Sequence, residues 1–305
     1  MSYQDRVKKW LVPHVANDAS QYEQLDSLLR TRVPGSCTWL FQHDPFRRWL
    51  CDNDAPPLLW IEGQPGLGKS VLCSTAIQHA LSLKMCTIFY YCRFDTQRTV
   101  VQAAGCLLEQ LFDHLCRKDE RIAHAAVDIT KKISNPTTEG LLTMANYLIR
   151  ELQRIEASDL GQPPKLLIFI DGPDEELREE EILGPFVFKL LEEFPSVLRV
   201  WVSSRRSQRL YSLLKRYPTI CLKEHTSLDV RTYLETAMHE IDEEWCDEDN
   251  FADGVILPKL LQRCQGNFLF ARFLADFIKE ESFRPNELLQ KIQEKLPANL
   301  SNTYQ

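Results

Sequence analysis

Short apolar runs alternate with helix-length segments along the central part of the chain. Each run holds four or five residues, and the runs lie at 58–61, 87–91, 166–170, 198–202 and, more weakly, 219–222. Their apolar positions are mostly continuous, which is typical of strands that are buried on both faces of a sheet. The segments that separate them are predicted helices, at roughly 69–83, 97–116, 138–157, 182–193 and 207–216. Strands separated by helices predict an α/β fold, a three-layer domain with a parallel five-stranded sheet.

The pattern differs on both sides of this alternation. Near the amino terminus Val7, Leu11 and Val15 recur at helical spacing, and Pro13 interrupts them. After residue 223 the strand pattern stops, and the apolar sets predict helices at 228–234, 257–261, 268–277 and 288–292. Gly266 lies between two of these helices, where a left-handed residue ends a helix. We therefore expect an N-terminal helical and linker segment at 1–55, a core domain at 56–223 and a small helical domain at 224–305.

The composition excludes several classes of protein. Of the 305 residues, 44% are hydrophobic and 26% are charged, which is ordinary for a globular chain and unlike a disordered or collagen-like one. The formal net charge of −7 disfavours a broadly basic nucleic-acid binder, so we expect no nucleic-acid partner. No stretch approaches the length of about 18 apolar residues that a membrane-spanning helix needs.

The ten cysteines also carry information about the compartment. No pair has the C-x-x-C spacing of zinc ribbons or redox motifs, and several cysteines lie within apolar runs, which predicts small buried thiols. The amino-terminal residues are polar and of mixed charge, without the apolar core of a secretory signal. Unpaired thiols and the lack of an export signal predict a reducing compartment, and hence a cytoplasmic location.

One glycine-rich segment carries the strongest chemical signal. The sequence GQPGLGKS at 63–70 matches the phosphate-binding pattern G-x-x-x-x-G-K-[ST] at every fixed position, after a predicted strand and before a predicted helix. Glycines adopt backbone angles that are closed to other residues, so successive N–H groups can point at phosphates, and the helix start adds a positive dipole end. The predicted nucleotide-binding residues are Gly63, Gln64, Pro65, Gly66, Leu67, Gly68, Lys69, Ser70 and Val71.

Three side chains are expected to bind the phosphates and a magnesium ion. Lys69 places its charge on the β- and γ-phosphates, and the Ser70 hydroxyl is a hard-oxygen ligand for Mg²⁺. The run at 166–170 is an apolar strand that ends in the carboxylate of Asp171. Because ligands lie beyond the carboxyl ends of parallel strands, we expect Asp171 on the same rim as Ser70, as the second magnesium ligand.

Further charged residues follow the third and fourth predicted strands. A hydrolytic site needs a base or a water-orienting residue just beyond the magnesium ligand, and Asp174 and Glu175 are the candidates. The run at 198–202 is followed by Ser203-Ser204-Arg205-Arg206, and the Arg205 guanidinium matches phosphate oxygens by a forked geometry, so it is a candidate sensor of the γ-phosphate. The alternative for the acidic run is a turn with a helix cap, and the alternative for the basic run is a solvated helix start.

These elements together resemble the NACHT class of STAND-type P-loop NTPases, closest to the fungal proteins with a nephrocystin-like N-terminal region. Trp10-Leu11 and the segments 32–40 and 46–50 look like the region that precedes the phosphate loop in that family. The run 171–175 fits its extended acidic motif, and 257–270 looks like its helical segment. Ser203-Ser204-Arg205 resembles its Thr-Ser-Arg sensor, although Ser replaces Thr and Arg206 stands where a proline is usual.

The resemblance implies a sheet order of 5-1-4-3-2 and a switch between ATP and ADP, with Mg²⁺ as the metal. Bound nucleotide would hold the helical domain against the sheet, and exchange would permit self-association in innate-immunity-like signalling. Family members usually carry C-terminal repeats and often an N-terminal effector domain, and we expect such domains outside this chain. The chain ends where a winged-helix region would begin, so we expect either a truncated chain or a short family member.

Three functions remain open from the sequence. The first is a nucleotide-dependent signalling switch with slow ATP hydrolysis, in which contacts to the γ-phosphate bias two conformations. The second is a small phosphotransferase or kinase, which would need a cluster of arginines over the sheet, whereas the arginines between the second and third strands are scattered. The third is a nucleotide-binding scaffold without turnover.

Overall fold

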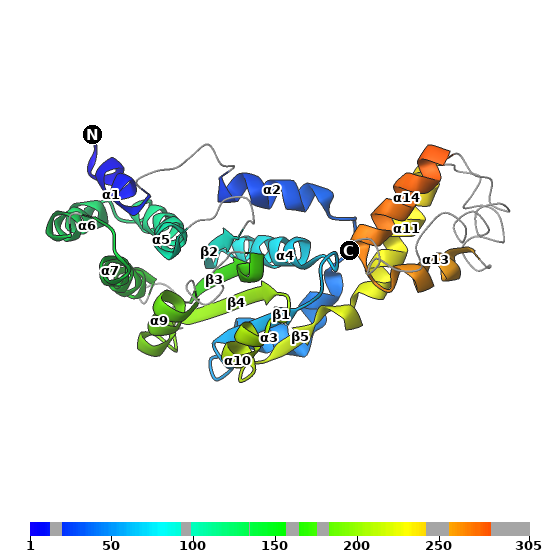
Figure 1. The fold of residues 1–305 in the computed structure, drawn as a ribbon. Helices are drawn as coiled ribbons and strands as arrows, with labels where there is room; N and C mark the ends of the chain where they lie inside the picture. The colour runs from blue at the N-terminus through cyan, green and yellow to red at the C-terminus, as the bar shows by residue number, and fades with distance from the viewer. Residues whose placement is uncertain are drawn as a thin grey trace. The chain divides into compact units, whose positions relative to one another are not determined.

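The computed structural model describes residues 1–12, 20–92, 99–133, 135–156, 165–175, 183–241 and 256–281 (Figure 1). These residues form two compact units. The first unit comprises 1–30, 41–62 and 70–220, and the second comprises 31–40, 63–69 and the described part of 221–305. The expected helix at 288–292, and Pro13 and Val15, lie outside the described residues.

A five-stranded sheet organises the first unit, as the alternating pattern predicted (Figure 1). The strands run in the order β2-β3-β4-β1-β5, which is the implied order 5-1-4-3-2 read from the other edge. The ladders between β1 and β4, β4 and β3, and β3 and β2 are parallel. The strands are β1 (Leu58–Glu62), β2 (Cys86–Tyr91), β3 (Leu166–Asp171), β4 (Leu198–Ser204) and β5 (Thr219–Cys221).

Helices cover both faces of this sheet because its strands are apolar on both sides. Alternate residues such as Ile168 and Val200 join a large core with α5, α7, α9 and α10. The opposite face carries Phe169 and Trp201, whose rings pack against Trp49 of α3 with centroids 5.8 and 6.1 Å apart. The helices of this unit are α1 (Tyr3–Leu11), α2 (Gln21–Thr31), α3 (Asp44–Cys51), α4 (Lys69–Ser82), α5 (Val100–Cys116), α6 (Arg121–Lys132), α7 (Thr138–Glu156), α9 (Lys189–Glu193) and α10 (Gln208–Leu214).

Two glutamine side chains pair with the outer edge of β2. The Gln110 side chain accepts from Phe89 N at 3.1 Å and donates to Phe89 O at 2.8 Å. Gln21 of α2 accepts from Tyr91 N at 2.6 Å. An unpaired strand edge is a template for pairing with another chain, so these amides occupy groups that would otherwise be open to association.

The second unit contains a small helical core. It is built from α11 (Thr226–Ile241), α13 (Ile256–Cys264) and α14 (Phe268–Glu281), whose buried residues include Leu234, Leu260 and Leu274. Gly266 has a φ of +78° between α13 and α14, so the left-handed residue expected there is confirmed. A Cβ at Gly266 would lie 2.4 Å from Thr226 Oγ1, which leaves no room for a side chain.

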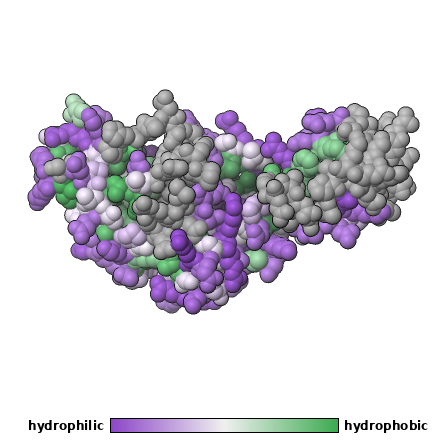
Figure 2. All heavy atoms as spheres, viewed as in Figure 1, coloured by the Kyte–Doolittle hydropathy of each residue, from purple (hydrophilic) through white to green (hydrophobic). Residues whose placement is uncertain are grey.

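The surface of the described residues is largely polar. On the face shown in Figure 2, hydrophilic residues surround small, separate apolar areas. Within the described ranges no helix combines the length and the apolarity that a bilayer crossing requires.

Candidate functional site

The glycine-rich loop joins the end of β1 to the start of α4, and Lys69 is the first residue of that helix. Gly66 and Gly68 have φ values of +79° and +83°, in the left-handed region that favours glycine. The loop therefore combines a backbone turn that glycine adopts readily with the amino end of a 14-residue helix. Such an arrangement presents N–H groups and a positive partial charge to an anion.

Gly63 differs from the other two glycines of the motif. Its φ is not in the left-handed region, so the expectation that it supplies an unusual backbone angle is wrong. The requirement at Gly63 is space, because an added Cβ would lie 3.2 Å from the Cβ of Leu222 and 3.4 Å from Cδ1 of Leu67. Gly63 thus lets the loop pack closely against the chain that follows β5.

The Lys69 side chain folds back over the loop that precedes it. Its ammonium donates hydrogen bonds to Gly63 O at 2.9 Å and to Gln64 O at 3.2 Å. The charge is therefore held at the entrance of the loop by backbone carbonyls, where a phosphate bound to the loop's N–H groups would attract it.

Asp171 ends β3 as a buried carboxylate with a fixed orientation. Ser203, its register partner on β4, donates a hydrogen bond of 2.5 Å from Oγ to Asp171 Oδ1. Trp201 Nε1 in turn donates to Ser203 Oγ at 3.1 Å. Because all three residues are buried, this chain of hydrogen bonds holds the carboxylate in one orientation.

The first turns of α4 lie close to this carboxylate. Burial raises the pKa of the Cys73 thiol well above its usual value, and the charge of Asp171 raises it further. Ser74 Oγ bonds to Tyr91 OH at 2.7 Å and donates to Ser70 O at 2.8 Å. These contacts bring the start of α4, which carries Ser70, to the same end of the sheet as Asp171.

The acidic run after β3 places two carboxylates in different environments. The Asp174 side chain is only 5% exposed, and its Oδ2 lies 3.3 Å from Nε of Arg205, whose side chain is half exposed. Glu175, by contrast, is exposed. The structure thus brings Asp174 and Arg205 together as an ion pair. Arg206 is placed differently, with its guanidinium 4.2 Å from the ring centroid of Tyr211 and its Nη1 3.6 Å from Oε2 of Glu62 at the end of β1.

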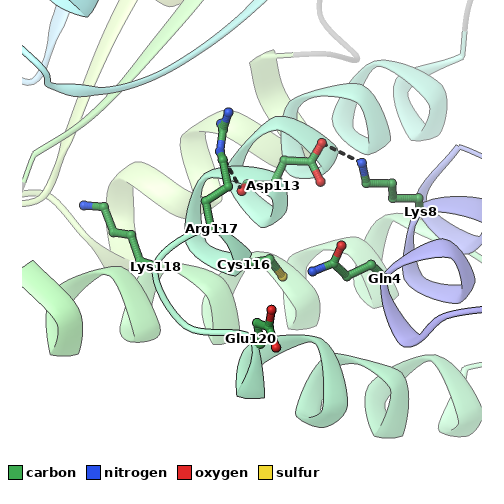
Figure 3. A pocket seen from close by; sticks show the side chains of 7 residues that line it. All are labelled: Gln4, Lys8, Asp113, Cys116, Arg117, Lys118 and Glu120. Carbon is green, nitrogen blue, oxygen red and sulfur yellow. Dashed lines mark hydrogen bonds and ion pairs between the residues drawn. The ribbon is translucent and has the colours of Figure 1, made fainter.

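A separate polar pocket of about 420 Å³ lies beside α1 and the end of α5 (Figure 3). Lys8 donates to Asp113 at 2.7 Å, and burial raises the pKa of the Cys116 thiol to about 11. Arg117 and Lys118 extend away from Lys8, so the three cations do not converge on one point (Figure 3). None of the predicted site residues lines this pocket, whose walls are Gln4, Lys8, Asp113, Cys116, Arg117, Lys118 and Glu120.

Sequence reasoning missed some of the residues that shape the site. It treated Ser203 as part of a motif and did not predict its bond to Asp171, although the order of the strands makes the two residues neighbours. It also missed the hydrogen bond of 2.9 Å from Asn267 Nδ2 to Pro65 O in the loop, which joins residues 202 positions apart. No local pattern signals a contact over that distance.

The model of one protein family matches this chain. The family is described as Nephrocystin 3, N-terminal, and the match covers residues 35–205, more than half of the chain. It includes the glycine-rich loop, Asp171 and Arg205. A comparison with curated protein sequences finds no match.

Several solved structures are similar over most of the chain. They include the Aeropyrum pernix ORC1 protein in complex with DNA, at 12% identity and a TM-score of 0.44, with 94% of this chain and 69% of that one covered. The ORC2 protein of the same organism, with ADPNP and ADP, has 11% identity and a TM-score of 0.44 over 98% and 73% of the two chains.

AMPPCP-bound DnaA from Aquifex aeolicus has 16% identity and a TM-score of 0.41 over 88% and 67%. Because these TM-scores lie below 0.5, we draw no functional inference from the three structures. The strand order, the loop between β1 and α4 and the acidic end of β3 together make the fold that of a P-loop NTPase, and the chain belongs to the Nephrocystin 3 N-terminal family.

Proposed function

We propose that this chain is an ATP- and ADP-binding switch of the NACHT type with slow, Mg²⁺-dependent ATP hydrolysis. The observation that carries the proposal is the loop between β1 and α4, in which Gly66 and Gly68 adopt left-handed angles ahead of Lys69. A loop with these angles presents N–H groups to phosphates without side chains in the way. The resemblance of 171–175 and 203–205 to the NACHT motifs supports the narrower class.

The residues present fit a nucleotide with a magnesium ion. Gly66 and Gly68 both have left-handed φ values that disfavour other residues, and an added Cβ would lie 2.4 Å from Asn267 Oδ1 at Gly66 and 3.3 Å from the ring of Phe268 at Gly68. The Ser70 hydroxyl and the Asp171 carboxylate are hard oxygen donors, which Mg²⁺ prefers. In this proposal the loop N–H groups and Lys69 bind the phosphates, and Ser70 and Asp171 hold Mg²⁺, which when bound neutralises phosphate charge.

The two carboxylates beyond Asp171 receive different roles. Glu175 is exposed, so it is the side chain that we assign to orienting the attacking water. Asp174 is ion-paired with Arg205, and we assign it to holding that arginine, which in turn contacts the γ-phosphate. A contact that exists with ATP and is lost with ADP is what a switch requires, because only differential contacts shift a conformational equilibrium. Self-association in one nucleotide state is the expected output.

Phosphate release and nucleotide binding test this proposal together. We expect wild-type protein to bind ATP and ADP and to release phosphate slowly, Lys69→Ala to lose binding by about a hundredfold or more, and Glu175→Gln to bind normally but lose turnover. Lys215→Ala, which removes an exposed lysine after α10, is the matched control and should match wild type.

Each alternative function gives a different result. Wild-type binding without any phosphate release would favour the scaffold without turnover. Transfer of the γ-phosphate to an added nucleoside monophosphate, at a rate above hydrolysis, would favour a phosphotransferase. A wild-type protein that binds neither ATP nor ADP would contradict the proposal as a whole.

A further inference from the structure

The amino end of α14 is hydrogen-bonded to the tip of the glycine-rich loop. Phe268 N donates to Gly66 O at 2.8 Å, and Leu269 N lies 3.4 Å from the same oxygen. The amide of Asn267 donates from Nδ2 to Pro65 O at 2.9 Å. Both carbonyls at the tip of the loop therefore have partners in α14 or immediately before it.

Asn267 has two functions in this contact. Its Oδ1 accepts a hydrogen bond from Phe270 N at 3.0 Å, as the N-cap residue of a helix does. Its Nδ2 makes the bond to the loop. The residues before it, Gln265 and Gly266, have φ values of +48° and +78°. This tight turn sets the direction in which the chain leaves α13 and places Asn267 at the start of α14. The side chain is thus held at both of its polar atoms.

The contact fixes which way the loop's peptide groups face. In a planar trans peptide the C=O and the N–H point in opposite directions. Because the Pro65 carbonyl points at Asn267, the N–H of Gly66 in the same peptide faces away from α14. A loop that binds an anion through N–H groups needs its carbonyls turned away from the anion, since the partial charge of a carbonyl oxygen repels phosphate.

We propose that Asn267 is a positioning residue for phosphate binding, which holds the Pro65 carbonyl toward α14 and the N–H of Gly66 away from it, free to face an anion. This inference rests on the proposed nucleotide-binding function and goes beyond it by naming a residue outside the motif. Preorganisation of the loop lowers the ordering cost of binding. By linkage, a bound nucleotide stabilises the docked α14 by the same factor, so Asn267 also couples the loop to the helical segment.

The test separates the loop bond from the helix cap. Asn267→Ser keeps a good N-cap residue for α14 but is too short and lacks the amide that bonds Pro65. We expect its Kd for ADP, measured by calorimetry, to rise about threefold to tenfold while its Tm stays close to that of wild type. Thr99→Ala, which removes the N-cap of α5, is the matched control and should leave the Kd unchanged.

Hydrogen exchange of the ligand-free protein supplies a readout that needs no nucleotide. Amides of residues 66–69 should exchange faster in Asn267→Ser than in wild type, and no faster in Thr99→Ala. An unchanged Kd or unchanged exchange in Asn267→Ser would overturn this inference and leave the proposed function standing. A wild-type protein that does not bind ADP would overturn the proposed function, and this inference with it.

Discussion

At the scale of single residues, hydrogen bonds fix the orientation of two buried carboxylates, Asp171 and Asp229. Asp171 is oriented by Ser203, and Ser203 by Trp201. Asp229 of α11 is similarly buried, and its Oδ2 accepts from Cys37 N at 2.9 Å and from Trp39 Nε1 at 3.2 Å. Within the second unit, the Asp229 bonds hold residues 37–39 to α11.

The pH dependence of stability tests the environment of Asp229. Burial raises its pKa above the usual 3.8, against the effect of its two hydrogen bonds. A carboxyl whose pKa is higher in the folded state stabilises most when protonated, so its contribution falls as the pH rises through that raised pKa. We expect the free energy of unfolding of wild type minus that of Asp229→Asn to decrease as the pH rises from the usual value of 3.8 through the raised pKa.

Urea titrations of both proteins over this pH range measure the difference, and the subtraction removes the other titrating groups. A difference that is constant with pH, or that increases, would contradict the assigned environment of Asp229. Asp128→Asn, at an exposed site on α6, serves as the control and should give a pH profile without this decrease.

At the scale of elements, one buried arginine holds the end of α3 to the sheet. Arg199 of β4 is fully buried, and its guanidinium donates to the carbonyls of Asp52 and Asn53 at 3.1 Å each. It also donates to Leu198 O at 2.9 Å and to Pro195 O at 3.4 Å. Positive charge is favourable at the carboxyl end of a helix, where carbonyls lack partners.

Replacing this arginine should be strongly destabilising. Arg199→Met keeps much of the volume but removes the donor from one buried and three partly buried carbonyls, so we expect a loss of about 3 kcal/mol in the free energy of unfolding. Arg47→Met, at an exposed position of α3, should change the same quantity by less than about 0.5 kcal/mol. Denaturant titrations compare the two variants, and equal losses would show that the carbonyl contacts contribute nothing specific.

The elements differ in how far the sequence predicts them. The strands were predicted because each is a continuous apolar run, and α4, α5, α7 and α10 because their apolar faces are wide. The helices α2 and α6 were not predicted. In α2 the only buried residue is Leu25, so its apolar stripe is narrow. The helix α6 buries Ile122, Ala123, Ala126 and Val127, a helical spacing that could have been recognised from the sequence but was not.

The residues of the candidate site also differ in how far the sequence predicts them. The loop at 63–70 could be predicted because its chemistry depends on consecutive residues. Gly63 was misinterpreted, because its role is close packing with Leu222, a contact that no local pattern encodes. The bonds from Ser203 to Asp171 and from Asn267 to Pro65 depend on the fold, which brings distant parts of the chain together. Only the strand order, once known, makes the first of these predictable.

At the scale of the whole molecule, the account depends on where the start of α4 lies on the sheet. The phosphate loop ends at Ser70, and the contacts of Cys73 and Ser74 bring the start of α4 to the end of the sheet that carries Asp171. If a nucleotide binds through a magnesium ion held by both residues, then removing the carboxylate should remove the effect of the metal. Binding through the loop alone should persist.

Calorimetric titration of ATP with and without Mg²⁺, in wild type and in Asp171→Asn, measures this relation most directly. We predict that Mg²⁺ tightens binding by about tenfold or more in wild type, because an ion held by Ser70 and Asp171 would neutralise phosphate charge. In Asp171→Asn the Mg²⁺ effect should fall below about threefold, with Mg²⁺-free affinity close to that of wild type. An equal Mg²⁺ effect in both proteins would contradict the account.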